Sequence, residues 1–92
     1  MDINSVPMVR VTWRDARDME TGWLDIKEII AAPLAVCQEI GWMVVNNDEK
    51  IVIMRSWCLD RDDNHGGGAI ALPKGWITKI EYLQVGHADV RN

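Results

Sequence analysis

The chain has 92 residues, of which 48% are hydrophobic and 26% charged, and its formal net charge is −4. This length fits one domain, and the hydrophobic fraction excludes intrinsic disorder, which needs low hydrophobicity together with high net charge. The acidic balance argues against a generally basic nucleic-acid binder, because phosphate neutralisation supplies most of that affinity, although a local basic patch is compatible with it. We therefore expect a single domain over residues 1–92, with residues 1–7 and 85–92 loose.

The cellular compartment follows from what the sequence does not contain. No apolar run approaches the ~18 residues of a membrane span, and no secretory leader is recognisable. Cys37 and Cys58 lie in apolar runs, as small buried thiols of a reducing compartment do. A disulfide between them stays open as an alternative that nothing in the sequence supports. We expect a cytoplasmic protein with no membrane partner.

Five Trp, one Tyr and no Phe make up the aromatic content. Trp combines a large apolar ring with one hydrogen-bond donor, so it serves both in cores and at interfaces. Five exceed what one small core needs, and we expect at least one on an interface or a binding surface. The alternative is that all five are buried or half-buried.

The first half of the chain predicts a strand, a loop and a short helix. Residues 8–14, MVRVTWR, alternate between apolar and polar side chains, which is typical of a half-buried strand. Residues 15–23 are polar and loop-like. Asp25 followed by Glu28 has the spacing of a capping box, which predicts a helix over residues 26–32. Its three isoleucines, at positions 26, 29 and 30, form the stripe that we expect to be buried, and Pro33 ends it.

A long hairpin follows. Residues 34–45 read as a strand that is interrupted by Gly41, which predicts a bulge or a sharp bend. Residues 46–49, NNDE, predict a turn because Asn and Asp adopt turn geometry readily. Residues 51–59 predict the returning strand.

The remaining chain predicts a polar loop and two more strands. Residues 60–68, DRDDNHGGG, read as a mobile hairpin tip. Asp60, Asp62 and Asn64 have the spacing of the first ligands of a calcium loop, but His65 and Ala71 replace the Gly and the bidentate Glu that such a loop needs. Residues 68–72 predict a strand, 73–76 a tight turn of 3₁₀ type, and 77–82 the last strand.

Five strands and one short helix in this order predict a mainly β, small and strongly bent five-stranded barrel. Closure is favoured because it protects the sheet edges of so small a protein. The alternative is an open sheet with the helix packed across one face.

The order of these elements resembles that of the SH3-like barrels, and among them that of the ring-forming, RNA-binding Sm/LSm proteins. The chain also resembles small uncharacterised phage and marine-metagenome proteins that share short motifs. Those motifs appear here as Val11-x-Trp13-x-Asp15, Gly41-Trp42, Leu72-Pro73-Lys74 and Ile77-x-x-Ile80. The resemblance covers most of residues 9–83 and implies a homo-oligomeric ring of roughly five to seven copies.

The resemblance to Sm proteins also points to a binding site. Lys74, Gly75 and Ile77 resemble the basic-Gly loop that helps to hold RNA, with one residue fewer before the Ile. Gly41 and Asp48 resemble the start of the central Sm hairpin motif. Ile51-Val52 stands where that motif has Met-Asn, so the base-contacting Asn is lost and uracil-type recognition is not implied.

Two groups of residues are the candidates for binding single-stranded RNA or DNA. Lys supplies phosphate contacts and Trp a stacking surface. The main group lies at the central turn and before the last strand: Asn46, Asn47, Lys50, Lys74, Gly75 and Trp76. The second is a basic patch of Arg10, Arg14 and Lys79, joined by Arg17 in the loop. Each has an ordinary alternative, a polar turn with a core Trp in the first case and solvated or interface charges in the second.

No constellation of residues points to an enzyme. His65 and His87 lie in a loop and a tail, and the carboxylates are scattered, so no acid/base pair can be named. No cysteine–histidine spacing or phosphate-binding loop is present, and we expect no metal, cofactor or catalytic residue. The alternatives to nucleic-acid binding are a structural or protein-interaction module of a phage, and an oligomer that sequesters a small anionic ligand.

Overall fold

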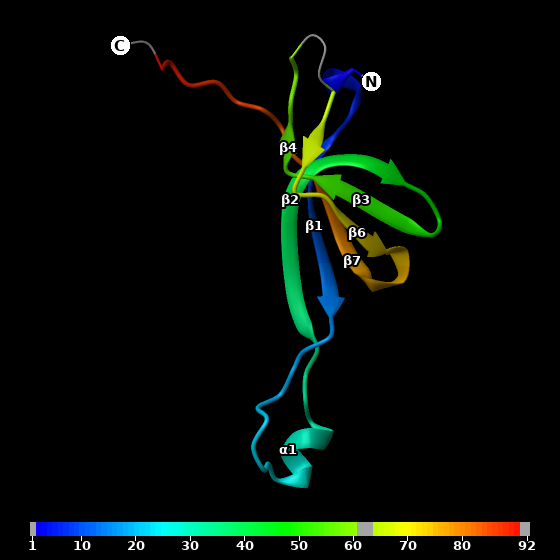
Figure 1. Cartoon of the computed structure of the whole chain (residues 1–92), viewed down its shortest axis with the longest axis vertical. Helices are drawn as coiled ribbons and strands as arrows, with labels where there is room; N and C mark the ends of the chain where they lie inside the picture. Colours follow the sequence, from blue (N-terminus) through cyan, green and yellow to red (C-terminus); the bar gives the residue numbers. More distant parts are fainter. Residues whose placement is uncertain (1, 61–63, 91–92) are drawn as a thin grey trace.

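The computed structural model describes residues 2–60 and 64–90. The protein is mainly β, with 45% strand and 13% helix. A five-stranded antiparallel sheet has the order β6-β3-β2-β1-β7, and β4 and β5 form a separate two-stranded ribbon (Figure 1). The strands are β1 (Met8–Asp15), β2 (Ala35–Asn46), β3 (Lys50–Met54), β4 (Ser56–Trp57), β5 (Gly66–Gly67), β6 (Ile70–Pro73) and β7 (Ile77–Tyr82). The helical elements are the 3₁₀ turns η1 (Ile3–Ser5) and η2 (Lys74–Trp76) and the α-helix α1 (Ile26–Ile30).

Strand β1 confirms the alternation that its sequence predicts. Val9, Val11 and Trp13 are buried on the concave face of the sheet, while Arg10 and Arg14 lie on the convex face. Successive side chains of a strand point to opposite faces, so one apolar set can cover a core while the other set meets water.

The core lies inside the bend of the sheet and draws on four strands. Its buried side chains are Val9, Val11, Trp13, Met43, Ile51, Ile53 and Leu72. Half-buried side chains, among them Ile77 and Ile80 of β7, pack against its margin. This core is small for the length of the chain, because a large part of the sequence lies away from it.

The sequence predicts that Gly41 interrupts the second strand, but it does not. The strand runs unbroken from Ala35 to Asn46, and its register against β3 shifts between Met43 and Val45 instead. The reason for a glycine at position 41 is close packing. A Cβ there would lie 2.5 Å from Cγ2 of Ile53 and 2.5 Å from the backbone oxygen of Met54, distances that side chains do not tolerate.

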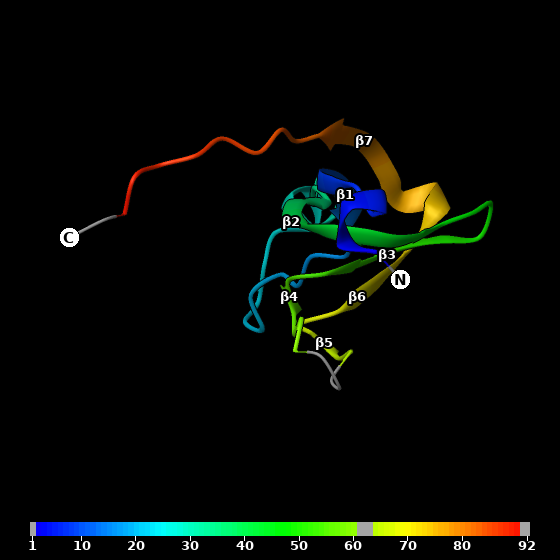
Figure 2. The ribbon, with the colours of Figure 1, turned by 90° about the horizontal axis from the view of Figure 1, so that it is seen from above.

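The predicted closed barrel is wrong, because the sheet bends strongly but stays open. β6 and β7 are its two edges, and η2 joins them at one end without any hydrogen-bonded pairing between them (Figure 2). β6 follows β3 from Pro73 to Ile70, whereas β7 follows β1 on the far side of the sheet. Each edge strand forms hydrogen bonds with its inner neighbour only, so both outer edges stay unpaired in the described part of the chain.

The returning strand of the hairpin divides in two, contrary to the prediction of one strand over residues 51–59. β3 ends at Met54, and the chain turns at Arg55 into the ribbon of β4 and β5. Residues 66–67, expected to be loop, form β5, whose Gly67 oxygen accepts from Arg55 N at 3.1 Å. Asp62, of the rejected calcium spacing, lies outside the described residues.

The helix begins where the sequence predicts, but it does not pack against the sheet as the sequence predicts. Oδ1 of Asp25 accepts from the backbone N–H of Lys27 at 2.9 Å, and α1 ends at Ile30, earlier than expected. The prediction of a buried isoleucine stripe is wrong, since Ile26, Ile29 and Ile30 are all exposed. Extended segments on both sides carry α1 beyond the end of β1 and β2, where the sheet offers nothing to pack against (Figure 1).

Residues 16–34, which we call the arm, therefore project from one end of the molecule. The radius of gyration is 18.1 Å, against about 12 Å for a compact domain of this length. The principal extents are 56 × 39 × 24 Å. Much of the chain is thus held outside the compact sheet.

Candidate nucleic-acid interface

The turn between β2 and β3 is built by the side chain of Asn47. Its Oδ1 accepts from the backbone N–H groups of Glu49 and Lys50, both at 2.9 Å. The backbone N–H of Asn47 donates to the backbone oxygen of Lys50 at 3.1 Å. Asn forms such turns because its short amide mimics a backbone carbonyl. The predicted turn is confirmed, and the carbonyl end of Asn47 is engaged in holding it.

The residues before the last strand come to the same place. The backbone N–H of Lys74 donates to the Glu49 oxygen at 2.9 Å, and its Nζ donates to Oδ1 of Asn46. Lys50 pairs in register with Pro73, next to Lys74. The fold thus joins two segments that are separated in sequence, and we call Asn46, Asn47, Lys50 and Lys74 the turn cluster.

The charge of the turn cluster is modest. Lys50 and Lys74 supply two positive charges, and Asp48 and Glu49 in the same turn supply two negative ones. An exposed surface of this kind gives weak, salt-sensitive phosphate contacts from one copy of the chain.

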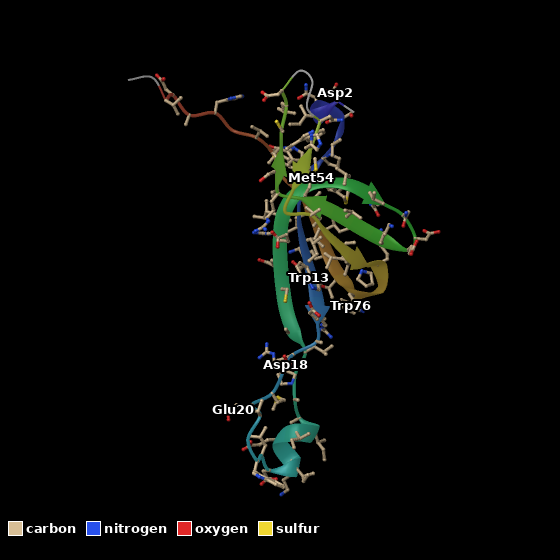
Figure 3. All side chains as sticks on the ribbon, viewed as in Figure 1. Asp2, Trp13, Asp18, Glu20, Met54 and Trp76 are labelled. Atoms are coloured by element: carbon tan, nitrogen blue, oxygen red, sulfur yellow. The ribbon has the colours of Figure 1, made fainter. Side chains whose placement is uncertain are left out.

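Gly75 and Trp76 do not join the turn cluster. Both line a separate hollow of about 500 Å³ at the base of the arm, together with Arg14, Asp15, Ala16, Leu34 and Thr78. The hollow beside the turn cluster, about 240 Å³, is lined by Glu49, Lys50, Ala71, Leu72 and Pro73 and shares no residue with it. Trp76 is 45% exposed at the edge of the sheet (Figure 3), so its ring is accessible for stacking.

The predicted second basic patch is largely neutralised. Nε and Nη2 of Arg10 donate to the two carboxylate oxygens of Glu81 at 2.8 and 2.9 Å, and Nζ of Lys79 lies 3.5 Å from the same carboxylate. The side-chain hydrogen bond to Glu81 raises the pKa of Arg10, and its partner hydrogen bond lowers the pKa of Glu81. Arg14 lies apart, in the hollow of Trp76, without an ion pair among the described residues.

The five tryptophans take different roles. Trp13 is buried, and Trp42 and Trp57 meet edge to face with ring centroids 5.9 Å apart. Trp23 is fully exposed on the arm, and Trp76 is partly exposed. The alternative that all five are buried or half-buried is wrong, because Trp23 is exposed, while a Trp at an interface or on a binding surface stays a prediction. Trp23 was the residue that sequence reasoning missed, and its place in a polar stretch next to the apolar helix stripe was the signal.

The described residues contain no group of three or more His, Cys, Asp or Glu side chains that could hold a metal ion. The same residues contain no helix that is long and apolar enough to cross a membrane.

Comparisons with known proteins do not add to these observations. No protein family, no curated protein and no solved structure matches this chain. What the chain does has to be inferred from its own geometry.

Proposed function

We propose that the protein is a non-enzymatic, Sm-like, ring-forming module that binds single-stranded RNA or DNA through the turn cluster. The observation that carries the proposal is the joining of Asn46 and Lys50 to Lys74 across the sheet. The two segments that the Sm resemblance assigns to nucleic-acid binding are neighbours in this fold.

The open sheet supports assembly. β6 and β7 each leave one edge unpaired in the described chain, and unpaired edges are templates for pairing with another strand. Pairing β6 of one copy with β7 of the next would give a closed ring if the rotation between copies is regular. A ring repeats the turn cluster, so contacts that are weak singly add by avidity.

The binding mode is sequence-tolerant rather than base-specific. Ile51, at the position of the Sm motif's Met, is fully buried in the core, and Val52 beside it is half-buried and apolar. Lysine contacts to phosphate and stacking on Trp76 remain, and stacking is worth about 1–3 kcal/mol per base whatever the base is.

Fluorescence anisotropy with labelled single-stranded oligonucleotides at low salt tests the proposal. The wild-type chain should bind, and Lys50→Ala/Lys74→Ala should weaken binding about tenfold and reduce the dependence on salt, because two phosphate contacts are lost. Lys27→Ala, which removes an exposed positive charge on the arm, is the control and should bind like wild type. Absence of binding by the wild type at tens of micromolar would refute nucleic-acid binding.

A specific observation favours a second candidate, a structural or protein-interaction module such as a phage assembly uses. The formal charge is −4, and several of the cations are engaged: Arg10 with Glu81, Arg55 with Glu39 at 3.5 Å, and Lys74 with Asn46. An intact oligomer that ignores oligonucleotides in the same titration would support this candidate.

A further inference from the structure

The arm exposes an apolar surface that a free chain would not leave in water. Trp23 is 104% exposed, Ile26 67% and Ile30 79%, relative to the same residues in an extended peptide. Ile26 and Ile30 are four positions apart, so both lie on one face of α1. Large apolar patches at the surface of soluble proteins mark sites of association.

This surface continues onto the sheet. Leu34 and Trp76 line one hollow of about 500 Å³, and Leu34 and Val36 line another of about 290 Å³, with Arg14 in both. We call the whole surface the arm strip, and it comprises Trp23, Ile26, Ile30, Leu34, Val36 and Trp76. Its members follow the chain from residue 23 on the arm to residue 36 in β2, and Trp76, which Figure 3 labels, shares the hollow of Leu34.

The arm itself needs a packing partner. α1 has five residues, whereas isolated helices shorter than about 12–15 residues are marginal in water. Its local support is the Asp25 cap, and within the described chain no other element packs on it closely. Burial of the arm strip would supply the packing that the helix lacks.

We propose that the arm strip pairs with the arm strip of a second copy of this chain, antiparallel and related by a two-fold axis. The exposed area of its six residues is on the order of 900 Å², which is what each partner of a standard interface buries. A long, narrow strip can cover itself when the copies run in opposite directions, and such isologous pairing is the commonest in oligomers.

The charges of the arm fit the antiparallel arrangement. Toward the tip, Glu20, Asp25 and Glu28 outnumber Lys27. At the base, Arg14 and Arg17 form no ion pair among the described residues. The Asp15 carboxylate accepts from Trp13 Nε1 at 3.3 Å and from Ala16 N at 2.7 Å and keeps its charge, so the base is balanced in charge whereas the tip is acidic. Asp18 is the remaining base carboxylate (Figure 3). Antiparallel pairing brings the acidic tip of one copy to the arginines of the other.

The first experiment compares particle masses by size-exclusion chromatography with light scattering. Ile26→Asp/Ile30→Asp removes the apolar face, and because both side chains are exposed, circular dichroism should show an unchanged sheet. We expect the wild-type particle to have twice the mass of the variant particle. Val90→Asp adds a charge at a still more exposed apolar residue outside the arm and should keep the wild-type mass. Equal masses for the wild type and the arm variant would overturn the proposal.

The second experiment tests the direction of pairing. Glu20→Lys/Glu28→Lys and Arg14→Glu/Arg17→Glu should each lose the mass doubling, since like charges then meet in both halves of the dimer. An equimolar mixture of the two variants should regain it, because acidic and basic ends meet again. Failure of the mixture to recover would overturn the antiparallel arrangement. A wild-type mass that grows without limit with concentration would also overturn the antiparallel arrangement, because it indicates head-to-tail docking of the arm. The hollow beside Ile3, Met8 and Trp42 is one place where the arm of another copy would then dock.

The arm pairing and the phosphate contacts of the turn cluster use different residues. Trp76 is the one residue that both proposals involve, as a stacking ring in the first and as the base of the arm strip in the second. The Ile26→Asp/Ile30→Asp variant should still bind oligonucleotides through the turn cluster. If this variant loses the mass doubling and keeps oligonucleotide binding, the result bears on the arm pairing alone. If Lys50→Ala/Lys74→Ala loses oligonucleotide binding and keeps the mass doubling, the result bears on the turn cluster alone.

Discussion

Gly41 and Gly75 lie under opposite steric constraints. A side chain at position 41 would meet Ile53 and the Met54 backbone, whereas a Cβ at position 75 would have no heavy atom within 4 Å. Gly75 also lacks the positive φ that Gly68 has. The fold therefore requires a glycine at position 41 and not at position 75.

The paired substitutions Gly41→Ala and Gly75→Ala test this difference. Gly41→Ala should destabilise the protein by about 1–3 kcal/mol, the usual cost of overpacking. Gly75→Ala should leave stability unchanged or raise it by up to about 1 kcal/mol, because alanine restricts the unfolded chain. Urea unfolding measures both, and similar losses for the two variants would contradict the assigned roles.

The Arg10–Glu81 ion pair makes a residue-level prediction about pH. Arg10 holds the pKa of Glu81 below its ordinary value of 4.5, so the pair adds stability above that pH and loses it as the pH falls through the lowered pKa. Glu81→Gln should therefore lower Tm slightly at pH 7, and the difference from wild type should vanish in acid once the pH is below the lowered pKa of Glu81. High salt should shrink the difference too, because both side chains are only partly buried and salt screens their interaction.

Thermal unfolding of wild type, Glu81→Gln and the control Glu49→Gln at several pH values checks the prediction. Glu49 is exposed, lies outside the arm and forms no ion pair among the described residues, so its substitution should leave Tm nearly constant at every pH. A Glu81→Gln deficit that persists unchanged into acid would show that the ion pair is not its cause.

At the scale of elements, the strands were predictable and the placement of the helix was not. Alternation fixed which face of β1 is buried, and Asn47 and Asp25 marked the start of a turn and of a helix. The isoleucine stripe predicted burial wrongly, because an apolar pattern does not say whether the fold brings a surface within reach to cover it. The joining of Lys74 to Asn46 depended on pairing between distant strands, which local sequence does not encode.

The β2–β3 turn offers a test at this scale. Asn47→Ala removes the acceptor for two backbone N–H groups and should cost about 1 kcal/mol in the free energy of unfolding. Asn47→Asp keeps the acceptor and should retain most of the stability. Urea titrations decide it, and equal losses in the two variants would mean that the side-chain oxygen does not hold the turn.

At the scale of the whole molecule, the sequence indicated a bent five-stranded sheet but not its open edges or the projecting arm. Closure was expected because free edges are a liability in a monomer. The structure keeps both edges free and places an apolar arm in solvent, and each feature is stabilised if the protein works as an assembly. The small core and the radius of gyration of 18.1 Å agree with this interpretation.

The most direct test of the account is the particle mass of the Ile26→Asp/Ile30→Asp variant, in which the arm pairing is removed and only edge pairing remains. Light scattering after size-exclusion chromatography should give a single closed ring of roughly five to seven chains, with one mass over a wide concentration range. A monomer across the concentrations used for oligonucleotide binding would contradict the ring, and with it the avidity on which the sparse turn cluster depends.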